Sequence, residues 1–479
     1  MNKRINTLFV AMAMVLSLVM VSCSEKQPDY VAVIPKDATA VVSVDMKSIA
    51  EKSNLAESPI LSFARKYAGM LLNDKTKQQL DAIIDDPSLT GLDFSVPVYL
   101  FQTPNHCVGL TIKVGDGSLL EEFLGVLENQ KICSAVKSHD DLQWVNIDDI
   151  NMAFDDDALL IMMSLEGQSV PDLMLALMQM PYEESFAASA GAEKIQKLNC
   201  GDIEAYFNLA GMPNDFVKQI EPMMPAGVQY SEVQMVAGLD FLKGEADLKM
   251  QLFSDNKKVQ KLLDEAADAF PPVDGTYAGI IPEDNKVWMT LGMEGDKALE
   301  QLKRIPQLKE KILALNMGVD FDNIVRAIDG DALIVADSDN KITLVARLGN
   351  TDFTKDIDYW MKSAKEYGID FRRYDDEQFK ISAEGHDVYF AVHGKDLYIS
   401  EVPYWLGGYK EKENLLKDDI VGKKMFTLID PGFQLMPFNK VIVSVDEDME
   451  ITVRVQTQNV MDNVLKEILN SATKGLKLF

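Results

Sequence analysis

The chain has 479 residues and a formal net charge of −28 at pH 7, with 47% hydrophobic and 25% charged residues. A chain of this length and hydrophobicity can bury sizeable cores, which excludes a disordered stalk and suggests two or more domains. The strong negative charge argues against partners that are themselves negative, such as nucleic acid or anionic lipid surfaces.

The N-terminus begins with two basic residues, Lys3 and Arg4, followed by the apolar run Leu8–Val21. This is the layout of a secretory signal, because roughly 15 apolar residues are fewer than the ~20 that a membrane-spanning helix needs. The run ends at Ser22 and Cys23, after which the chain becomes polar. We therefore predict a signal peptide over residues 1–22.

The residues around Cys23 resemble the lipobox of bacterial lipoproteins, in which the cysteine is lipidated and becomes the first residue of the mature chain. Met20 stands where the usual motif has leucine, and this looser form is similar to lipoproteins of the Bacteroidetes. The resemblance implies lipidation of Cys23 and a lipidated tether over residues 23–29. A cleaved secretory peptide with an incidental cysteine is the alternative.

A lipid anchor predicts a water-soluble body held at a membrane face, since several acyl chains together make anchoring durable. The segment Ser24-Glu25-Lys26 has a single acid close to Cys23 and lacks the acidic run typical of surface export in that phylum. We therefore expect the periplasmic face of the outer membrane rather than the cell surface. Cleavage would leave 45 basic and 75 acidic side chains, a net charge of −30.

Besides Cys23 the chain has only three cysteines, Cys107, Cys133 and Cys200. One disulfide among them is open, but three cysteines cannot form a disulfide framework.

The mature chain contains an internal repeat. Tyr30–Asp37 matches Tyr277–Asp284, and the ungapped comparison, shifted by 247 residues, has eight identities in the 32 positions from Tyr30 to Leu61. Alternating apolar residues follow in both copies and predict a half-buried strand. A helical stretch comes next, interrupted at Pro59 and Pro306, where the lost N–H should kink or restart the helix.

The order of the later elements also repeats. Each copy continues with two strands, a turn into a helix, an acidic turn before a Gln-aromatic strand, and a hairpin. In the first copy the two strands are Val96–Gln102 and Val108–Val114, the acidic turn is Asp140-Asp141 and the hairpin is Asn151–Met163. In the second copy the two strands are Ala332–Ala336 and Ile342–Leu348, the acidic turn is Asp375-Asp376 and the hairpin is Asp387–Ser400. Further strands follow, and Asn256 and Asn459 stand where N-caps belong, before the predicted helices Lys257–Ala267 and Val460–Asn470.

We predict an α+β fold with two tandem duplicated units over residues 30–270 and 275–470, separated by the turn-rich stretch Ala269–Gly275. Strands joined by short turns favour antiparallel sheets, with helices packed on one face.

The segment Tyr30–Met46 has the pattern Y-x-x-x-I-P-x-D-A-x-x-V-x-x-x-D-M. This pattern after a lipobox resembles a Bacteroidetes lipoprotein family known only as a domain of unknown function. The resemblance implies a location and a fold, but no activity, cofactor or site residue.

The sequence offers no convincing catalytic or metal-binding set. The four histidines, His106, His139, His386 and His393, lack a spacing that places two of them on one helical face for zinc. Cys107 follows His106 directly, and strand neighbours point to opposite faces, which argues against a thiolate–imidazolium pair. The chain has no nucleophile elbow and no phosphate-binding loop. We therefore expect no enzyme activity, no cofactor and no metal.

Two acidic features remain open. Asp140-Asp141 and Asp375-Asp376 could bind calcium or flank a sugar bond, although aspartates that open tight turns explain them more simply. Asp337–Lys341 begins like a calcium loop but lacks the later glycine and glutamate, so we predict a hairpin turn there.

Two methionine-rich stretches, Leu173–Met180 and Pro222–Pro225, would suit either core packing or a groove for an apolar ligand. We expect core packing.

The resulting functional prediction is a non-enzymatic envelope lipoprotein that binds or scaffolds a protein partner. The alternatives are a periplasmic carrier or chaperone for an apolar ligand or peptide, and a hydrolase that uses the paired aspartates.

Overall fold

A computed structural model gives the structure of the chain. It describes residues 29–55, 61, 74–139, 142–167, 169–211, 218, 221, 224, 228–280, 285–316, 319–366, 368–375, 378–383, 385–403, 417–430 and 438–476. Several predicted features lie outside these residues, namely the signal peptide, Cys23, Pro59, Asp140, Asp141, Asp376 and most of Pro222–Pro225. Predictions about them stay predictions.

The chain divides into two compact units. Unit 1 contains the described residues up to Gly211, together with Gln234–Lys249 and the described residues from Asn459 onward. Unit 2 contains the described residues of Met212–Val233 and of Met250–Gln458. This division groups residues by their contacts and does not show whether two segments arose by duplication. The predicted repeat units, residues 30–270 and 275–470, therefore stay a prediction.

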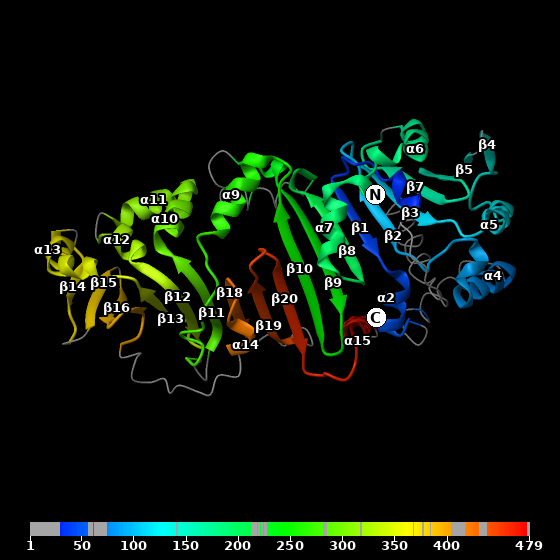
Figure 1. Ribbon diagram of the computed structural model, residues 1–479. Coiled ribbons are helices and arrows are strands. Elements are labelled where there is room, and N and C mark those ends of the chain that lie inside the picture. Colours follow the sequence, from blue (N-terminus) through cyan, green and yellow to red (C-terminus); the bar gives the residue numbers. More distant parts are fainter. Residues whose placement is uncertain are drawn as a thin grey trace. The chain divides into compact units, whose positions relative to one another are not determined.

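Unit 1 is built on an antiparallel sheet (Figure 1). Its strands lie in the order β4 (Lys137–His139), β5 (Leu142–Ile147), β6 (Ile150–Phe154), β7 (Ala158–Ser164), β3 (Cys107–Lys113), β2 (Val98–Gln102), β1 (Ala40–Val44), β8 (Ile203–Asn208) and β9 (Gln234–Phe241). Strand β9 also pairs with β10 (Glu245–Phe253).

Helical segments cover both faces of the unit 1 sheet. They are η1 (Asp29–Val33), α2 (Met46–Ser53), α4 (Asp74–Asp85), η3 (Pro87–Thr90), α5 (Gly117–Asn129), α6 (Pro171–Met178), η4 (Tyr182–Glu184), η5 (Phe186–Ala188), α7 (Ala190–Leu198), η6 (Leu209–Gly211) and α15 (Val464–Leu476). Met46 and Ala50 of α2 pack with Val98 and Ile112 on one face. Helix α7 contacts β8 and β9 on the other face.

The strands of unit 2 are also paired antiparallel. Its strands lie in the order β14 (Asp370–Arg373), β15 (Gln378–Ala383), β16 (His386–His393), β17 (Asp396–Ser400), β13 (Ile342–Leu348), β12 (Ile328–Asp337), β11 (Asn285–Glu294), β18 (Met425–Ile429), β19 (Phe438–Val445) and β20 (Ile451–Thr457). The sequence of strand partners is therefore the same as in unit 1.

The helical segments of unit 2 are η8 (Tyr230–Glu232), α9 (Lys257–Ala267), α10 (Gly295–Arg304), α11 (Pro306–Leu315), α12 (Phe321–Arg326), η9 (Asp352–Asp356), α13 (Ile357–Glu366) and α14 (Lys417–Ile420). Ile324 of α12 and Trp360 of α13 share a core with Ala332 and Ala346 of the sheet. Ile420 of α14 packs in a separate core around Trp288.

The mixed α and β fold with antiparallel pairing is confirmed, but the predicted packing of helices on one face is wrong in both units. The cause is visible in β1 and β11. Val41 and Ser43 are the buried residues of β1, and Trp288 and Thr290 are buried in β11. Because serine and threonine are polar, the sequence did not indicate that this second face of the sheet is covered. Their burial is possible when the hydroxyl forms a hydrogen bond; Thr290 donates to the Ala332 carbonyl at 3.1 Å.

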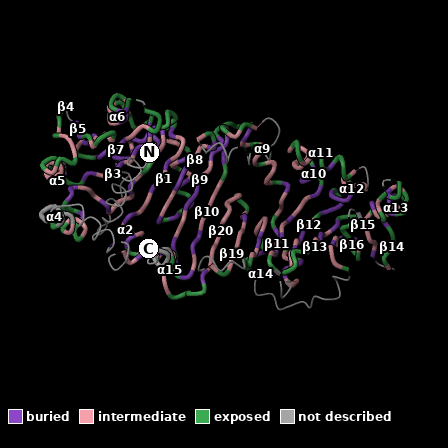
Figure 2. The backbone as a smooth tube through the Cα atoms, turned by 180° about the vertical axis from the view of Figure 1, so that it is seen from behind, coloured by how far each residue is buried: buried purple, intermediate pink, exposed green. Residues whose placement is uncertain are grey.

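Figure 2 shows the buried segments concentrated on the strands and the exposed ones on helices such as α11 and α13.

Several local predictions are confirmed. Asn256 caps α9 by accepting the Lys258 N–H. Pro306 is the first residue of α11, after α10 ends at Arg304, so the helix restarts at the proline. Asp337 accepts the backbone N–H groups of Asp339 and Lys341 and closes a hairpin turn.

The last predicted helix starts later than expected. Helix α15 begins at Val464 rather than Val460, and Asn463, not Asn459, accepts the N–H of Leu465 at its start. Among the described residues no helix has both the length and the apolar character required to cross a membrane.

Candidate functional site

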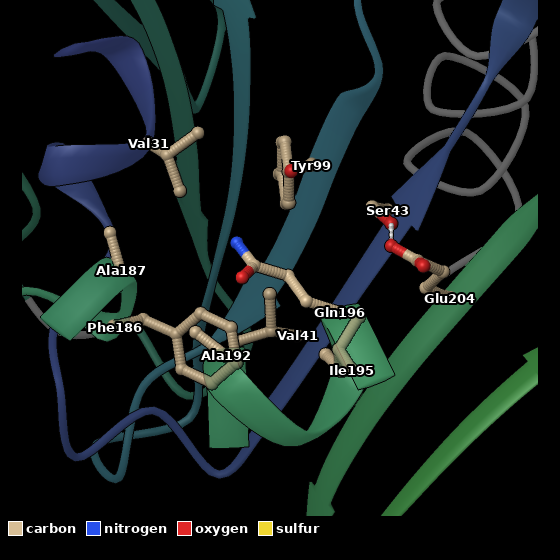
Figure 3. A pocket seen from close by; sticks show the side chains of 10 residues that line it. All are labelled: Val31, Val41, Ser43, Tyr99, Phe186, Ala187, Ala192, Ile195, Gln196 and Glu204. Carbon is tan, nitrogen blue, oxygen red and sulfur yellow. Dashed lines mark hydrogen bonds between the residues drawn. The ribbon is translucent and has the colours of Figure 1, made fainter. Parts of the chain in front are cut away.

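A small pocket lies in unit 1 between the sheet and the segments that cover it (Figure 3). Its volume is about 90 Å³. The sheet supplies Val41, Ser43, Tyr99 and Glu204, and the remaining lining residues are Val31, Phe186, Ala187, Ala192, Ile195 and Gln196 from η1, η5 and α7.

Strand register brings the four sheet residues together. Ser43 on β1 is paired with Tyr99 on β2 and with Glu204 on β8, so the three side chains form one row across the sheet. Val41 lies two residues away on β1 and points to the same face, because side chains alternate along a strand. Figure 3 shows Tyr99 and Gln196 between Val31 on one side and the Ser43–Glu204 pair on the other.

Helix α7 forms one wall of the pocket because it approaches the sheet closely. Ser189 caps its first turn by accepting the Ala192 N–H at 3.1 Å. A Cβ atom at Gly191 would lie 2.6 Å from the ring of Tyr206 on β8, so only glycine allows this approach. Ala192 and Ile195 then face the pocket, and the exposed Gln196 lies at its mouth.

Glu204 is the chemically unusual group of the pocket. Burial raises its pKa from an ordinary value of 4.5 to about 7; a hydrogen bond donated by the Ser43 hydroxyl opposes the rise, and the nearby Asp240 carboxylate adds to it. The Ser43 Oγ to Glu204 Oε2 distance is 3.3 Å. Burial, followed by the charge of Glu204, raises the pKa of Tyr99 to about 12. Glu204 can therefore change its protonation state near neutral pH.

Two polar groups at the pocket have unused hydrogen-bonding capacity. In the part of the chain that the structure describes, Glu204 makes no ion pair, and the Tyr99 hydroxyl makes no hydrogen bond. None of the ten described lining residues is basic. The pocket thus combines an uncompensated carboxyl group with apolar and aromatic walls.

In the described part of unit 2, packed side chains occupy the equivalent positions. Strand register places Trp288, Thr290, Leu333 and Phe426 where unit 1 has Val41, Ser43, Tyr99 and Glu204. Trp288 and Leu333 are completely buried there, and the rings of Trp288 and Phe426 meet edge to face at 6.2 Å. The same strand pairing can therefore be filled by side chains, so the cavity of unit 1 comes from its choice of residues.

A second, open hollow of about 610 Å³ lies in unit 2 and is rich in acids. Its lining includes Asp320, Asp322, Asp356, Asn316 and Tyr359. Asp320 caps α12, and Asp322 pairs with Lys303 and accepts the Asn316 amide at 2.8 Å. Local structure accounts for these two acids. Within the described ranges no three His, Cys, Asp or Glu side chains are close enough to hold a metal ion.

Among the residues that the structure describes, those singled out from the sequence do not converge on a site. His106 is exposed at a turn, and the exposed His386 and His393 stand at opposite ends of β16. Cys107, Cys133 and Cys200 are free thiols, so no disulfide joins them. Asp375 accepts the Gln378 N–H at 2.7 Å, as a turn residue does. The hydrolase hypothesis also involves Asp140, Asp141 and Asp376 and stays a prediction.

The methionine-rich segment around α6 forms no exposed methionine face. Met174 is completely buried, and Met178 and Met180 are half-buried. The expected core packing therefore holds for Met174.

Sequence reasoning missed Glu204 and Tyr99. In the predicted strand Asp202–Leu209, alternation puts Glu204 on the same face as Asp202, Tyr206 and Asn208, and Tyr206 is the one aromatic residue of that mostly polar face. An acid at such a position is normally assigned to solvent. Only the position of α7 shows that it is partly buried.

A family model described as Domain of unknown function (DUF4836) matches residues 30–402. The chain belongs to this family. No curated protein matches this DUF4836 member. Among solved structures, crystal form III of TP0453 is 12% identical, with a TM-score of 0.27, over 52% of this chain and 90% of that one. Crystal form IV of TP0453 is 12% identical, with a TM-score of 0.27, over 47% and 81%. A likeness of this size carries no argument about fold or function.

Proposed function

We propose that this DUF4836 protein is a non-catalytic binding protein of a bacterial cell envelope, anchored by lipid on Cys23 at the periplasmic face of the outer membrane. Its body is a tandem duplication in which unit 1 provides the ligand pocket. Support for the anchor comes from the signal-like N-terminus and the residues around Cys23. Support for the duplication comes from the 247-residue repeat and the shared order of strand partners.

The main support for a binding function is that the two units differ in how the equivalent positions are packed. Trp288 and Phe426 fill in unit 2 the space that Val41 and Glu204 leave open in unit 1. An open cavity costs packing energy, because its walls lose dispersion contacts and Glu204 is partly desolvated. A cavity kept at that cost in only one of two similar cores supports a binding role.

The size of the pocket favours a small ligand over a lipid carrier. Sites for drug-sized molecules have volumes of about 300–1,000 Å³, whereas this pocket has about 90 Å³. A long acyl chain or a peptide segment would not fit in it. We therefore favour binding of a small molecule over a carrier role for a large apolar ligand.

The binding function is tested by closing the pocket. A library of small molecules is screened by ligand-observed NMR against the full mature chain, against Ala192→Leu, which fills the pocket from α7, and against Glu193→Leu. Glu193 is the exposed neighbour on the same helix and does not line the pocket. Ligands of the wild type should lose binding in Ala192→Leu and keep it in Glu193→Leu. Ligands that bind both variants equally, or the absence of any ligand, would contradict the proposal.

A further inference from the structure

We propose that the pocket of unit 1 binds a compact organic ammonium group, with Glu204 as its counter-ion and with Tyr99 and Phe186 as aromatic walls. This inference rests on the proposed binding function and adds the chemical class of the ligand.

When Glu204 is ionised, the pocket carries an uncompensated negative charge. Glu204 receives one hydrogen bond, from Ser43, and among the described residues it has no cationic partner. A partly buried carboxylate without a partner is unfavourable, and a cation that enters the site relieves that cost. An anionic ligand would meet the opposite situation, since no basic residue lines the pocket.

The walls favour an organic cation over a metal ion. Six lining residues are aliphatic or aromatic without a polar group: Val31, Val41, Phe186, Ala187, Ala192 and Ile195. Hard metal ions prefer several oxygen ligands, and Glu204 is the only carboxylate among the lining residues that the structure describes. An alkylammonium ion instead uses both parts of the site, because its charge pairs with Glu204 while its carbon atoms contact the aromatic and aliphatic walls.

The size of the pocket limits the part of the ligand that enters. About 90 Å³ accommodates an ammonium group on a short alkyl chain. That group could belong to a free amine or to a lysine side chain of another protein. The hydroxyl of Tyr99, which makes no hydrogen bond among the described residues, is available as an acceptor for the ammonium protons.

Proton binding to Glu204 should compete with the cation. The titratable groups that interact with its carboxyl are Asp240 on β9, Tyr99 on β2 and Cys200 before β8, while α7 contributes Gln196, which does not titrate. The pKa of Glu204 is about 7. Affinity for an ammonium ion should therefore increase as pH rises through that value, because only the ionised carboxylate attracts the cation.

The test titrates the full mature chain with three probes of similar size, propylammonium, 1-propanol and propionate, followed by protein-observed NMR at about pH 8.5, above the pKa of Glu204. The variants are Glu204→Gln, which keeps the shape and removes the charge, and Glu193→Gln, which removes a charge from the exposed side of α7. Propylammonium should bind best and lose roughly tenfold or more in affinity in Glu204→Gln only, since a charge-assisted contact is lost. A fourth probe is Nα-acetyl-lysine amide, whose side-chain ammonium group is free. If it binds more tightly than propylammonium, the source of the ammonium group is a protein side chain.

A second experiment uses the wild-type protein alone and varies the pH. In the wild type, propylammonium affinity should fall between about pH 8.5 and pH 5.5, whereas that of 1-propanol should not. Equal binding of propylammonium and 1-propanol, with no effect of pH or of Glu204→Gln, would overturn the ammonium assignment and leave the binding function standing. Binding of none of the probes, together with an unsuccessful library screen, would overturn both.

Discussion

Asp202 and Glu204 lie two positions apart in the chain, yet their carboxylates have very different surroundings. The Asp202 side chain is completely buried and accepts hydrogen bonds from Ser48 Oγ, from Lys52 Nζ at 2.6 Å and from the Phe241 N–H at 2.6 Å. It therefore ties α2 to β9. Glu204 has one weak partner and faces a cavity. The first arrangement supports the fold, and the second leaves capacity for a ligand.

Replacement of Asp202 by alanine should destabilise unit 1 strongly. The change leaves the Lys52 ammonium group and the Phe241 N–H without their acceptor, a loss of about 2–4 kcal/mol in the free energy of unfolding. Urea unfolding of wild type and Asp202→Ala measures it. The control is Asp352→Ala, which breaks the exposed pair with Lys355 and should cost much less, because exposed ion pairs contribute little to stability. Similar costs for the two variants would show that Asp202 is not the tie described above.

The Glu204 carboxyl should make stability depend on pH in a defined window. Its folded-state pKa of about 7 lies above the ordinary value of 4.5, so the folded chain holds the proton more tightly than the unfolded chain. The resulting stabilisation is complete below pH 4.5, falls as pH rises, and is lost above about pH 7. Because the side chain is only partly buried, solvent screening reduces the effect to about 1 kcal/mol.

Urea unfolding at a series of pH values checks this dependence. Glu204→Gln should remove the loss of stability across the window and should be more stable than wild type above pH 7, since it carries no desolvated charge. Glu193→Gln should keep the wild-type dependence. Parallel pH profiles for wild type and Glu204→Gln would refute the assignment of the effect to Glu204.

The close approach of α7 to β8 depends on Gly191. A methyl group there would overlap the ring of Tyr206, so Gly191→Ala should cost about 1–3 kcal/mol and move the pocket wall. The matched control is Gly125→Ala in α5, where an added Cβ would have no atom within 4 Å; it should stabilise by roughly 0.5–1 kcal/mol, because glycine is a poor helix residue. Thermal unfolding measures both. A stabilising Gly191→Ala would mean that α7 does not need this approach.

The elements differ in how far sequence alone could predict them. Strands such as β1 and β11 were found because their alternation and the surrounding repeat agree, and the cap at Asn256 has a local cause that the sequence states directly. The second covered face was missed because Ser43 and Thr290 are polar yet buried. The pocket was missed for a related reason: the burial of Glu204 is produced by α7 and η5, which are brought to β8 by tertiary packing.

The two terminal helices are exchanged between the predicted repeats. Helix α9 belongs by sequence to the first repeat, yet it packs in unit 2, where Glu265 pairs with Arg304 of α10 at 2.7 Å. Helix α15 belongs to the second repeat and packs on α2 in unit 1, with Val464 completely buried. Each compact unit therefore contains a helix that the sequence analysis assigned to the other predicted repeat.

This exchange predicts that the two halves of the chain need each other. Fragments 24–270 and 271–479, produced together, should form a one-to-one complex, while each alone should be poorly folded because it lacks a helix of its compact unit. Co-purification and size-exclusion chromatography measure the association. Val464→Asp in the second fragment should abolish it, whereas Met461→Asp, at a position 79% exposed, should not. Two fragments that fold separately and do not associate would contradict the exchange.

The negative charge of the mature chain and the proposed lipid anchor have opposite effects on attachment to a membrane. After cleavage the mature chain would carry a net charge of −30, which repels anionic lipid headgroups. Membrane attachment would then depend on the acyl chains alone, since each buried CH₂ contributes about 0.8 kcal/mol and several chains are needed for a durable anchor.

Replacement of Cys23 by serine isolates that contribution. The wild-type chain, expressed with its own N-terminus in a bacterial host that processes lipoproteins, should partition into the detergent-rich phase and carry acyl chains detectable by mass spectrometry. Cys23→Ser should be found in the aqueous phase with an unchanged circular dichroism spectrum, because the substitution removes the site of acylation and replaces one small side chain by another. The matched control, Cys133→Ser, removes a free thiol of unit 1 and should partition like wild type. An unacylated wild-type protein in the aqueous phase would contradict the lipid anchor at Cys23. The binding function of unit 1 would then have to be assigned to a soluble protein.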